Sequence, residues 1–564
     1  MNNNMKFSTI KRHLLVIVLF VVITVVMTYP WAGHLNNWVH DGADSYFIAW
    51  TLAWDVHAFQ EGFSNIFDAN IFYPHENTLA YSEHLIGTAI LAWPIIALTN
   101  NPILAYNLVM FLFFVLGAYC MYLFMYYLTR NSAVSIISAI IFGFNPFRVI
   151  HFSQIHLQVI FFFPLILLIL HRLVNSKKNR NFVYLILAYV FLGYMSGHYF
   201  LMMTIVTAVF IIFYYAGIKK KLPDRRFIAK FILSFFIILL AVMPVFYPYF
   251  SVQNETGYSR SYHMISFFSP TISDYLAFSP LITKIVGIPY TIEKVLYSGF
   301  TIVILLIWSM YYLVKNRLQD QKTMYIMMLY LLIGVICLLL SFGVLIKFSS
   351  GDGGIVGPYA ILHKLVPGFD GLRALGRFFV IVLLSMSVMI GLGLKQILKK
   401  IGKKSLYIGV VIIISSLIML EYLWVPLFQP VPYREALVEE KVPEVYHWLS
   451  DLEGDPVILE LPLSENSIKP SEYIYLSSYH WQKMWNGYSG FYPEDYIRLY
   501  ERIMNNFSDP ETQDAISNIG VDYVVIHFDV QSEFIMNTSP EELDLLPNLE
   551  LIEQFGNDYV YEIN

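Results

Sequence analysis

The sequence predicts a polytopic α-helical membrane protein with about 11 spanning helices, followed by a C-terminal extracytoplasmic α/β domain. Of its 564 residues, 57% are apolar and only 14% are charged, and the mean hydropathy is +0.57. Soluble domains carry roughly 25% charged residues, so a water-soluble fold could not bury this much apolar surface. Apolar runs of spanning length recur before residue 430, and the rest of the chain is acidic. We therefore expect a membrane domain over 1–429 and a separate domain over 430–564.

The first apolar run extends from about His13 to Tyr29, after several basic residues. A signal peptide and a first spanning helix both begin in this way. The run is as long as a membrane span, and Tyr29-Pro30-Trp31 offers no small-residue cleavage site. We expect an uncleaved first helix.

The later apolar runs and the loops between them set the expected topology. Ten further runs are centred near Phe114, Ile140, Ile166, Leu187, Val206, Ile237, Leu305, Leu331, Leu384 and Ile413. Lys and Arg cluster in short loops around 177–180, 219–230, 315–322 and 395–404. Cytoplasmic loops are enriched in these residues, and all four clusters fall on the side of the N-terminus if the helices alternate. The sequence thus predicts a multi-pass plasma-membrane protein with a cytoplasmic N-terminus and an extracellular C-terminal domain.

One apolar segment breaks this alternation. Leu85–Thr99 is only about fifteen residues long and contains Pro94, and counting it as a span would put every later basic loop outside. We expect a re-entrant or interfacial helix at 85–99, within a first outer loop at 31–101. The other outward-facing segments are then 251–293 and 347–376.

In the C-terminal part, 457–462 and 521–527 are typical of strands, whereas 435–449 and 494–503 are typical of helices. No phosphate loop or dinucleotide fingerprint occurs there. The aromatic motif from Tyr479 to Gly490 has the composition of a sugar platform, of a membrane-facing loop or of an ordinary core.

The composition argues against a nucleic-acid partner and against a structural or metal-binding role for the two cysteines. The basic residues are confined to short loops and the net charge is −5, which argues against a nucleic-acid partner. Both cysteines lie in apolar runs, where a thiol usually packs as a small apolar group, so neither a disulfide framework nor a cysteine metal site is expected.

The first outer loop carries the most unusual residues of the chain. Its His40-Asp41-Gly42-Ala43-Asp44 run leads into an expected helix. Asp44 at the start of that helix would serve as an N-cap, as a catalytic base at the membrane surface, or as both. Asp41 is a candidate substrate-binding residue beside it.

These features resemble the GT-C superfamily of polytopic membrane glycosyltransferases. The shared layout is a first helix, a long outer loop with an acidic residue at a helix start, and a Tyr81-Ser82-Glu83 stretch before a short apolar helix. The resemblance implies a GT-C-like membrane domain and an enzyme that uses a polyprenyl-phosphate sugar donor. It makes Asp44 the catalytic aspartate and Glu83 a metal-associated acid.

A departure from the superfamily pattern occurs at 145–158. Many members carry a second acid in this outer loop, whereas here His156 or Gln158 stands at the approximate position. A neutral side chain can orient a hydroxyl or ligate a metal but lacks the charge of a carboxylate. We take His156 and Arg148 as candidate substrate-binding residues and leave the need for a divalent metal open.

Arg373 and Arg377 lie four residues apart at an expected helix start on the outer side. That spacing would place both guanidinium groups on one helix face, and arginine binds phosphate in a bidentate manner. They would bind a lipid phosphate, or they would pair with Asp370 and extend to the headgroups.

We expect transfer of a sugar from a polyprenyl-phosphate-linked donor to a glycan, lipid or protein acceptor on the outer side, with membrane lipids as partners. Asp44 and the nearer of the two arginines should then lie roughly 6 to 12 Å apart. A transporter or flippase for a lipid-linked glycan would place ionisable residues deep in the spans, and these are scarce. A non-catalytic assembly protein of the cell envelope is the third alternative.

Overall fold

The computed structural model describes residues 3–40, 42–63, 65–176, 178–257, 259–276, 294, 296–315, 320–349, 351–428, 433–464, 468–530 and 539–563. Asp41 lies outside these residues. The chain forms two compact units. We call Met1–Ala32, Met110–Met243 and Ser259–Val431 the helical unit, and Gly33–Val109, Pro244–Tyr258 and Pro432–Asn564 the mixed unit.

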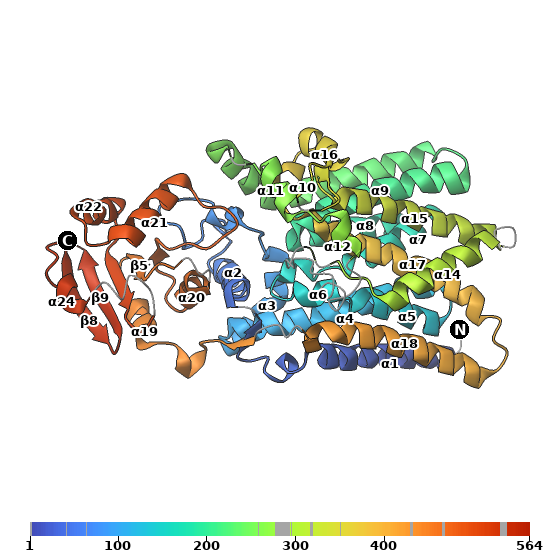
Figure 1. Cartoon of the computed structure of the whole chain (residues 1–564), viewed down its shortest axis with the longest axis horizontal. Helices are drawn as coiled ribbons and strands as arrows, with labels where there is room; N and C mark the ends of the chain where they lie inside the picture. The colour runs from blue at the N-terminus through green and yellow to red at the C-terminus, as the bar shows by residue number, and fades with distance from the viewer. Residues whose placement is uncertain are drawn as a thin grey trace. The chain divides into compact units, whose positions relative to one another are not determined.

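The helical unit is built from long apolar helices connected by shorter ones (Figure 1). They are α1 (Asn3–Thr28), α4 (Pro102–Thr129), α5 (Ser132–Gly143), α6 (Pro146–Ile150), α7 (Phe162–Ser176), α8 (Asn179–Met195), α9 (Gly197–Phe213), α10 (Arg225–Thr256), α11 (Tyr262–Phe268), α12 (Ile272–Leu276), α14 (Phe300–Lys315), α15 (Gln321–Ser341), α16 (Tyr359–Leu365), α17 (Phe379–Leu398) and α18 (Lys404–Phe428). The first residues of α4 and the last residues of α10 belong to the mixed unit. A short hairpin joins β2 (Leu345–Ile346) to β3 (Ile355–Val356).

Among the described residues, nine helical stretches are long and apolar enough to cross a membrane. The two other expected spans form α8 and α14, which have 17 and 16 residues. The expected polytopic α-helical fold is confirmed, and the chain is a multi-pass membrane protein.

Helix α17 lies at the centre of the helical unit and packs against α5, α14 and α15. Most of its residues are buried. Small residues allow the closest approaches within the bundle, as Gly143 of α5 shows. A Cβ added there would lie 2.6 Å from Cβ of Ala118 on α4, so only glycine permits this contact, as is common between membrane helices.

The mixed unit contains a five-stranded sheet with helices around it (Figure 1). Its elements are β1 (Trp38–His40), α2 (Gly42–Gln60), α3 (Ile86–Thr99), β4 (Tyr433–Glu435), α19 (Glu444–Ser450), β5 (Val457–Leu461), α20 (Ile468–Leu476), β6 (Lys483–Met484), α21 (Glu494–Asn506), α22 (Pro510–Ile519), β7 (Tyr523–His527), α24 (Pro540–Leu543), β8 (Leu549–Phe555) and β9 (Asp558–Ile563). The strand order is β6-β5-β7-β9-β8. Strands β6, β5 and β7 are parallel, and β9 runs antiparallel to β7 and β8.

Strands β5 and β7 and helix α21 lie where the sequence predicts them. The helix expected from Glu435 was wrong at its start, because Glu435 ends strand β4 and α19 begins only at Glu444. The cause is a tertiary contact, since β4 pairs antiparallel with β1, with Trp38 opposite Glu435. Local sequence does not contain that partner.

The first outer loop and the C-terminal part of the chain belong to one unit. Besides the β1–β4 pair, backbone hydrogen bonds join residues 70–73 to residues 484–486: Met484 N donates to Asn70 O at 2.7 Å, and Tyr73 N donates to Met484 O at 3.0 Å. Helix α2 packs along α20. The C-terminal α/β domain therefore includes residues from the first outer loop in its folded body.

Helix α3 is the short apolar segment expected at 85–99. Its 14 residues span about 21 Å, which is less than the roughly 30 Å hydrocarbon core of a bilayer. It ends at Asn100 in the left-handed conformation, with a φ of 51°, and it exposes Trp93 and Leu98. These features fit an interfacial helix, and its depth in the membrane stays a prediction.

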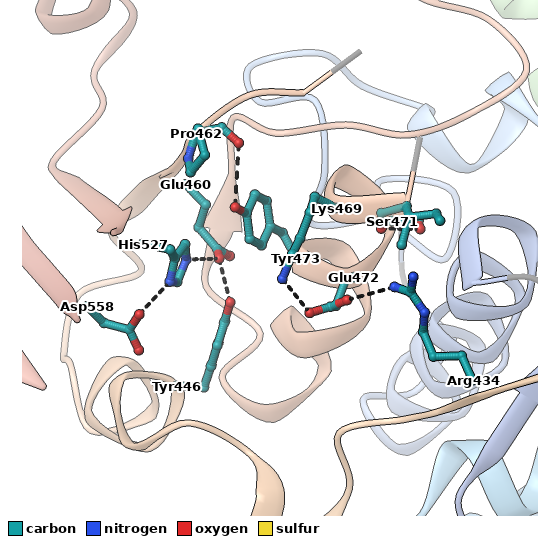
Figure 2. Close-up of polar contacts among 11 residues, drawn as sticks. Arg434, Tyr446, Glu460, Pro462, Lys469, Ser471, Glu472, Tyr473, His527 and Asp558 are labelled. Atoms are coloured by element: carbon teal, nitrogen blue, oxygen red, sulfur yellow. Dashed lines mark hydrogen bonds and ion pairs between the residues drawn. The ribbon is translucent and has the colours of Figure 1, made fainter. Parts of the chain in front are cut away.

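A buried polar cluster lies in the core of the mixed unit (Figure 2). Glu460 on β5 is fully buried, and its Oε2 accepts a hydrogen bond from the Tyr446 hydroxyl at 2.6 Å and lies 3.0 Å from His527 Nε2. The other ring nitrogen of His527 lies 2.8 Å from Asp558 Oδ1. Burial lowers the pKa of His527, but the hydrogen bonds to the two carboxylates and their negative charges outweigh it and raise the pKa to about 9. His527 is therefore a cation at neutral pH.

Candidate active site

Asp44 lies in the first turn of α2, two residues after the helix begins at Gly42. It is therefore inside the helix, where the N-terminal backbone N–H groups and the helix dipole favour a negative charge. Its Oδ1 accepts a hydrogen bond from the Tyr488 hydroxyl at 2.8 Å. A half-buried carboxylate with this environment can take up a proton from a bound hydroxyl group.

The start of α2 is held from two directions. Ser45 donates a hydrogen bond to the carbonyl of His40, and the buried Asn107 at the beginning of α4 donates to the carbonyls of Leu35 and Trp38 at 2.7 and 2.8 Å. Burial lowers the pKa of His40 to about 3, so its ring is neutral. The strand and turn before Asp44 are thus fixed by side-chain hydrogen bonds.

A second polar network borders the same helix end (Figure 2). Glu472 on α20 lies 3.0 Å from Lys469 and 3.8 Å from Arg434. A Cβ added at Gly42 would lie 3.1 Å from Ile468 on α20. Helix α2 therefore begins in close contact with the C-terminal domain.

Glu83, the other candidate acid taken from the first outer loop, lies beside Tyr249 of α10. The Tyr249 hydroxyl donates to the Ser82 carbonyl at 2.8 Å and accepts from His84 N at 2.8 Å. Glu83 is half-buried and within electrostatic range of that hydroxyl. The Tyr81-Ser82-Glu83 stretch is therefore anchored, as a site residue requires.

An aromatic segment at 487–493 contacts the first outer loop at Phe72 and at Tyr81. The ring of Phe491 meets that of Tyr81 edge to face at 5.1 Å, and Tyr492 packs on Phe72 at 5.6 Å. Burial raises the pKa of Tyr492, a hydrogen bond from Ser489 N lowers it, and the charge of Asp44 raises it again. The expected aromatic motif ends in this segment, so part of it faces the Asp44 region.

In the helical unit, the side chains of Arg260, Arg373 and Arg377 lie close to one another. Arg377 is 5% exposed and lies in a 3-10 turn, Leu375–Phe378, directly before α17. Arg373 stacks on Phe268 at 4.8 Å. Burial, together with the nearby charges of Arg373 and Arg377, lowers the pKa of Arg260 to about 10. The two predicted arginines are therefore together, although not on one face of an α-helix, because α17 begins only at Phe379.

Two histidines adjoin these arginines. His198 Nε2, in the first turn of α9, lies 3.2 Å from Arg377 Nη1. His156 lies next to His198, with ring centroids 6.2 Å apart. His156 thus borders the arginine cluster through His198, while its direct contact with a substrate stays a prediction.

Arg148 occupies a different environment from the one expected for a substrate-binding residue. It is fully buried, and its guanidinium group donates to Gln158 Oε1 at 2.9 Å and to the Gly143 carbonyl at 2.6 Å. Its guanidinium carbon lies 3.9 Å from the centre of the Phe114 ring. Gln158 in turn donates to the carbonyls of Arg148 and His151. Both residues therefore hold the 145–158 turn together, and we assign Arg148 a structural role.

Sequence analysis missed Arg260, His198 and Tyr488. Arg260 carried a usable signal, because it lies in an expected outer loop where the positive-inside rule disfavours arginine. The contacts of Tyr488 and His198 depend on residues far away in the chain and left no local signal. Within the described ranges, no three His, Cys, Asp or Glu side chains form a set that could hold a metal ion, and Glu83 as a metal ligand stays a prediction.

Comparison with known proteins places the chain in a family. The model of a domain of unknown function, DUF6311, matches residues 14–417. The chain belongs to this family. No match is found among curated proteins.

Solved structures identify the fold of this DUF6311 protein. It aligns with the apo oligosaccharyltransferase of Archaeoglobus fulgidus with a TM-score of 0.52 and 13% identity, over 92% of this chain and 70% of that one. It aligns with the arabinofuranosyltransferase AftD from Mycobacteria with a TM-score of 0.54 and 13% identity, over 98% of this chain but only 41% of that one. Both are GT-C glycosyltransferases, so the predicted GT-C fold is confirmed.

Proposed function

We propose that this DUF6311 protein is a GT-C glycosyltransferase that moves a sugar from a polyprenyl-phosphate-linked donor to an acceptor on the outer side of the membrane. The observation that carries the proposal is the gathering of Arg260, Arg373 and Arg377 on the outer loops of the helical unit. The proposal fits the fold shared with GT-C glycosyltransferases.

The arginine cluster supports an anionic ligand by its electrostatics. Three like charges repel one another, and partial burial increases the cost because less water screens them. Burial is the main cause of the lowered pKa of Arg260, and repulsion from Arg373 and Arg377 adds to it. A phosphate relieves it, since it offers negative charge and several acceptor oxygens to guanidinium groups. The phosphate of a lipid-linked donor meets this need at a membrane surface.

The proposed reaction uses Asp44 as the general base. Asp44 accepts the proton of the acceptor hydroxyl while that oxygen bonds to the anomeric carbon of the donor. The bond between this carbon and the phosphate oxygen breaks, and its electron pair leaves on the phosphate, whose charge the arginines balance. In-line attack inverts the anomeric configuration. The mechanism requires Asp44 and the arginines to meet across one bound donor and acceptor.

The proposed orientation follows from the basic loops. Lys219 ends the π-helical turn after α9 and Lys220 and Lys221 follow it, and all three are exposed. Lys400 follows α17 in an exposed turn. We propose that both turns are cytoplasmic and that Asn254, near the end of α10, and the C-terminus are external. Accessibility of tags at Lys220, Lys400, Asn254 and the C-terminus in intact cells tests this, and external labelling at Lys220 would contradict it.

The function is tested with purified protein in nanodiscs. The probes are undecaprenyl-phosphate-linked hexoses and pentoses, with alkyl glycosides and extracted surface glycans as acceptors. We expect donor-dependent transfer, and a loss of about 10²- to 10⁴-fold in Asp44→Asn, the usual contribution of a positioned base. Arg377→Gln should weaken the binding of undecaprenyl phosphate.

Asp68→Asn is the matched control, because Asp68 lies in the same outer loop, is exposed and only accepts a hydrogen bond from Asn77 N. Equal transfer by wild type and Asp44→Asn would remove Asp44 as the base. Translocation of the lipid-linked sugars across vesicles, without bond cleavage, would replace the transferase by a transporter.

A further inference from the structure

Tyr488 belongs to the C-terminal domain, yet its hydroxyl reaches the first turn of α2. The hydroxyl donates to Asp44 Oδ1 at 2.8 Å. A carboxylate oxygen accepts hydrogen bonds, and hydrogen bonds to charged groups are the stronger ones, so this contact fixes the orientation of the Asp44 carboxylate. A carboxylate with about four acceptor positions can hold this bond and also receive the proton of an acceptor hydroxyl.

The ring of Tyr488 is held by the same helix that carries Asp44. It meets Phe47 edge to face, with centroids 5.5 Å apart. Asp44 and Phe47 are three residues apart and so lie on one face of α2. Tyr488 therefore rests along one turn of α2, with its ring on Phe47 and its hydroxyl on Asp44.

The backbone before Tyr488 is fixed to the first outer loop. Phe72 N donates to the Asn486 carbonyl at 3.2 Å, and Gly487 N donates to the Tyr496 hydroxyl at 3.1 Å. Gly487 lies so close to the Phe72 ring that an added Cβ would overlap it. These contacts fix the backbone that carries Tyr488 and so hold its side chain beside Asp44, as a preorganised site requires.

We infer that Tyr488 is a positioning residue that orients the Asp44 carboxylate, so that the C-terminal domain completes the base of the active site. The inference rests on the proposed function. It gives the C-terminal domain a chemical role in the transfer step, in addition to any role in binding the acceptor.

The decisive variant is Tyr488→Phe, which keeps the ring contact with Phe47 and removes one hydroxyl. We expect kcat to fall about tenfold to a hundredfold, the loss typical of a hydrogen bond to a charged group, with the KM for the donor unchanged. Tyr500→Phe is the matched control, because it also removes one hydroxyl that donates a hydrogen bond in the same domain, to the Ser464 carbonyl at 2.9 Å. Its kcat should equal that of wild type.

A second readout does not depend on activity. A carbodiimide labels accessible carboxyl groups, and mass spectrometry of the full-length protein gives the extent of labelling of Asp44. In Tyr488→Phe the extent should rise severalfold, because the carboxylate has lost the hydroxyl that holds its Oδ1, while Tyr500→Phe leaves it unchanged.

The outcomes separate the two claims. An active wild type with an unchanged kcat in Tyr488→Phe would overturn the positioning role and leave the transferase intact. A wild type that transfers no sugar would sink the proposed function, and the extent of labelling would still decide whether Tyr488 holds the Asp44 carboxylate. An unchanged extent of labelling in Tyr488→Phe overturns the inference in either case.

Discussion

The buried His527 predicts that the mixed unit loses stability as the pH rises. Its two ring nitrogens face Glu460 and Asp558, and the rings of Tyr446 and Tyr473 stack against it. Burial raises the pKa of both tyrosines well above the usual value of 10.0, so they stay neutral over the window in which His527 titrates. Loss of the proton leaves the buried Glu460 and the half-buried Asp558 facing a neutral ring.

The size of the effect follows from the pKa. The value rises from 6.5 in the unfolded chain to about 9 in the folded protein. Because the folded-state pKa is the higher one, the stabilisation is fully present below pH 6.5 and is lost as the pH rises through about 9. Each pKa unit corresponds to about 1.4 kcal/mol, so the loss is on the order of 3 kcal/mol.

Pulse proteolysis of the full-length protein in urea, followed through a C-terminal tag, measures this stability between pH 6 and about 9.5. The variant His527→Gln keeps a polar side chain and cannot titrate. The difference in unfolding free energy between wild type and variant should shrink by on the order of 3 kcal/mol across the window. Parallel pH profiles for the two proteins would refute the reasoning.

Two further substitutions have opposite expected effects. Asp55 of α2 is fully buried, neither carboxylate oxygen has a hydrogen-bond partner among the described residues, and burial raises its pKa well above 3.8. Asp55→Asn should therefore raise the melting temperature at pH 7, and the gain should vanish below about pH 4, where the unfolded aspartate is also protonated; a constant gain would contradict this. Gly487→Ala should lower the unfolding free energy by about 1 to 3 kcal/mol, because the new Cβ overlaps the Phe72 ring. Urea midpoints measure it, and an unchanged midpoint would show that the ring moves aside.

The elements that the sequence predicted well are those whose pattern is local. The apolar runs gave the spanning helices, and the runs at 457–462 and 521–527 gave the central strands β5 and β7. Where a partner far away in the chain decides the structure, prediction failed. Glu435 joined a strand because β1 pairs with it. Arg148 is a different case: its partners, Gln158 and the Gly143 carbonyl, are near in sequence, but the turn that brings them to its guanidinium group has no simple sequence pattern.

The same distinction explains what was found of the site. Arg373 and Arg377 stood out as candidates because arginine is uncommon in loops expected to face outward and is costly where a helix enters the membrane; their role in binding phosphate stays a prediction. Arg260 carried the same signal in another loop. Tyr488 did not, because tyrosine is unremarkable in an aromatic motif, and only its 2.8 Å contact with Asp44 reveals its role.

The division into two units adds a constraint on the proposed mechanism. The base Asp44 and its partner Tyr488 belong to the mixed unit, whereas the arginines that would bind the donor phosphate belong to the helical unit. In the proposed mechanism, binding of lipid phosphate and activation of the acceptor are therefore assigned to different units of the chain. Substitutions around Asp44 should then change kcat without changing the affinity for undecaprenyl phosphate. Substitutions of the arginines should lower that affinity. A variant of the mixed unit that folds, yet abolishes phosphate binding, would contradict this separation.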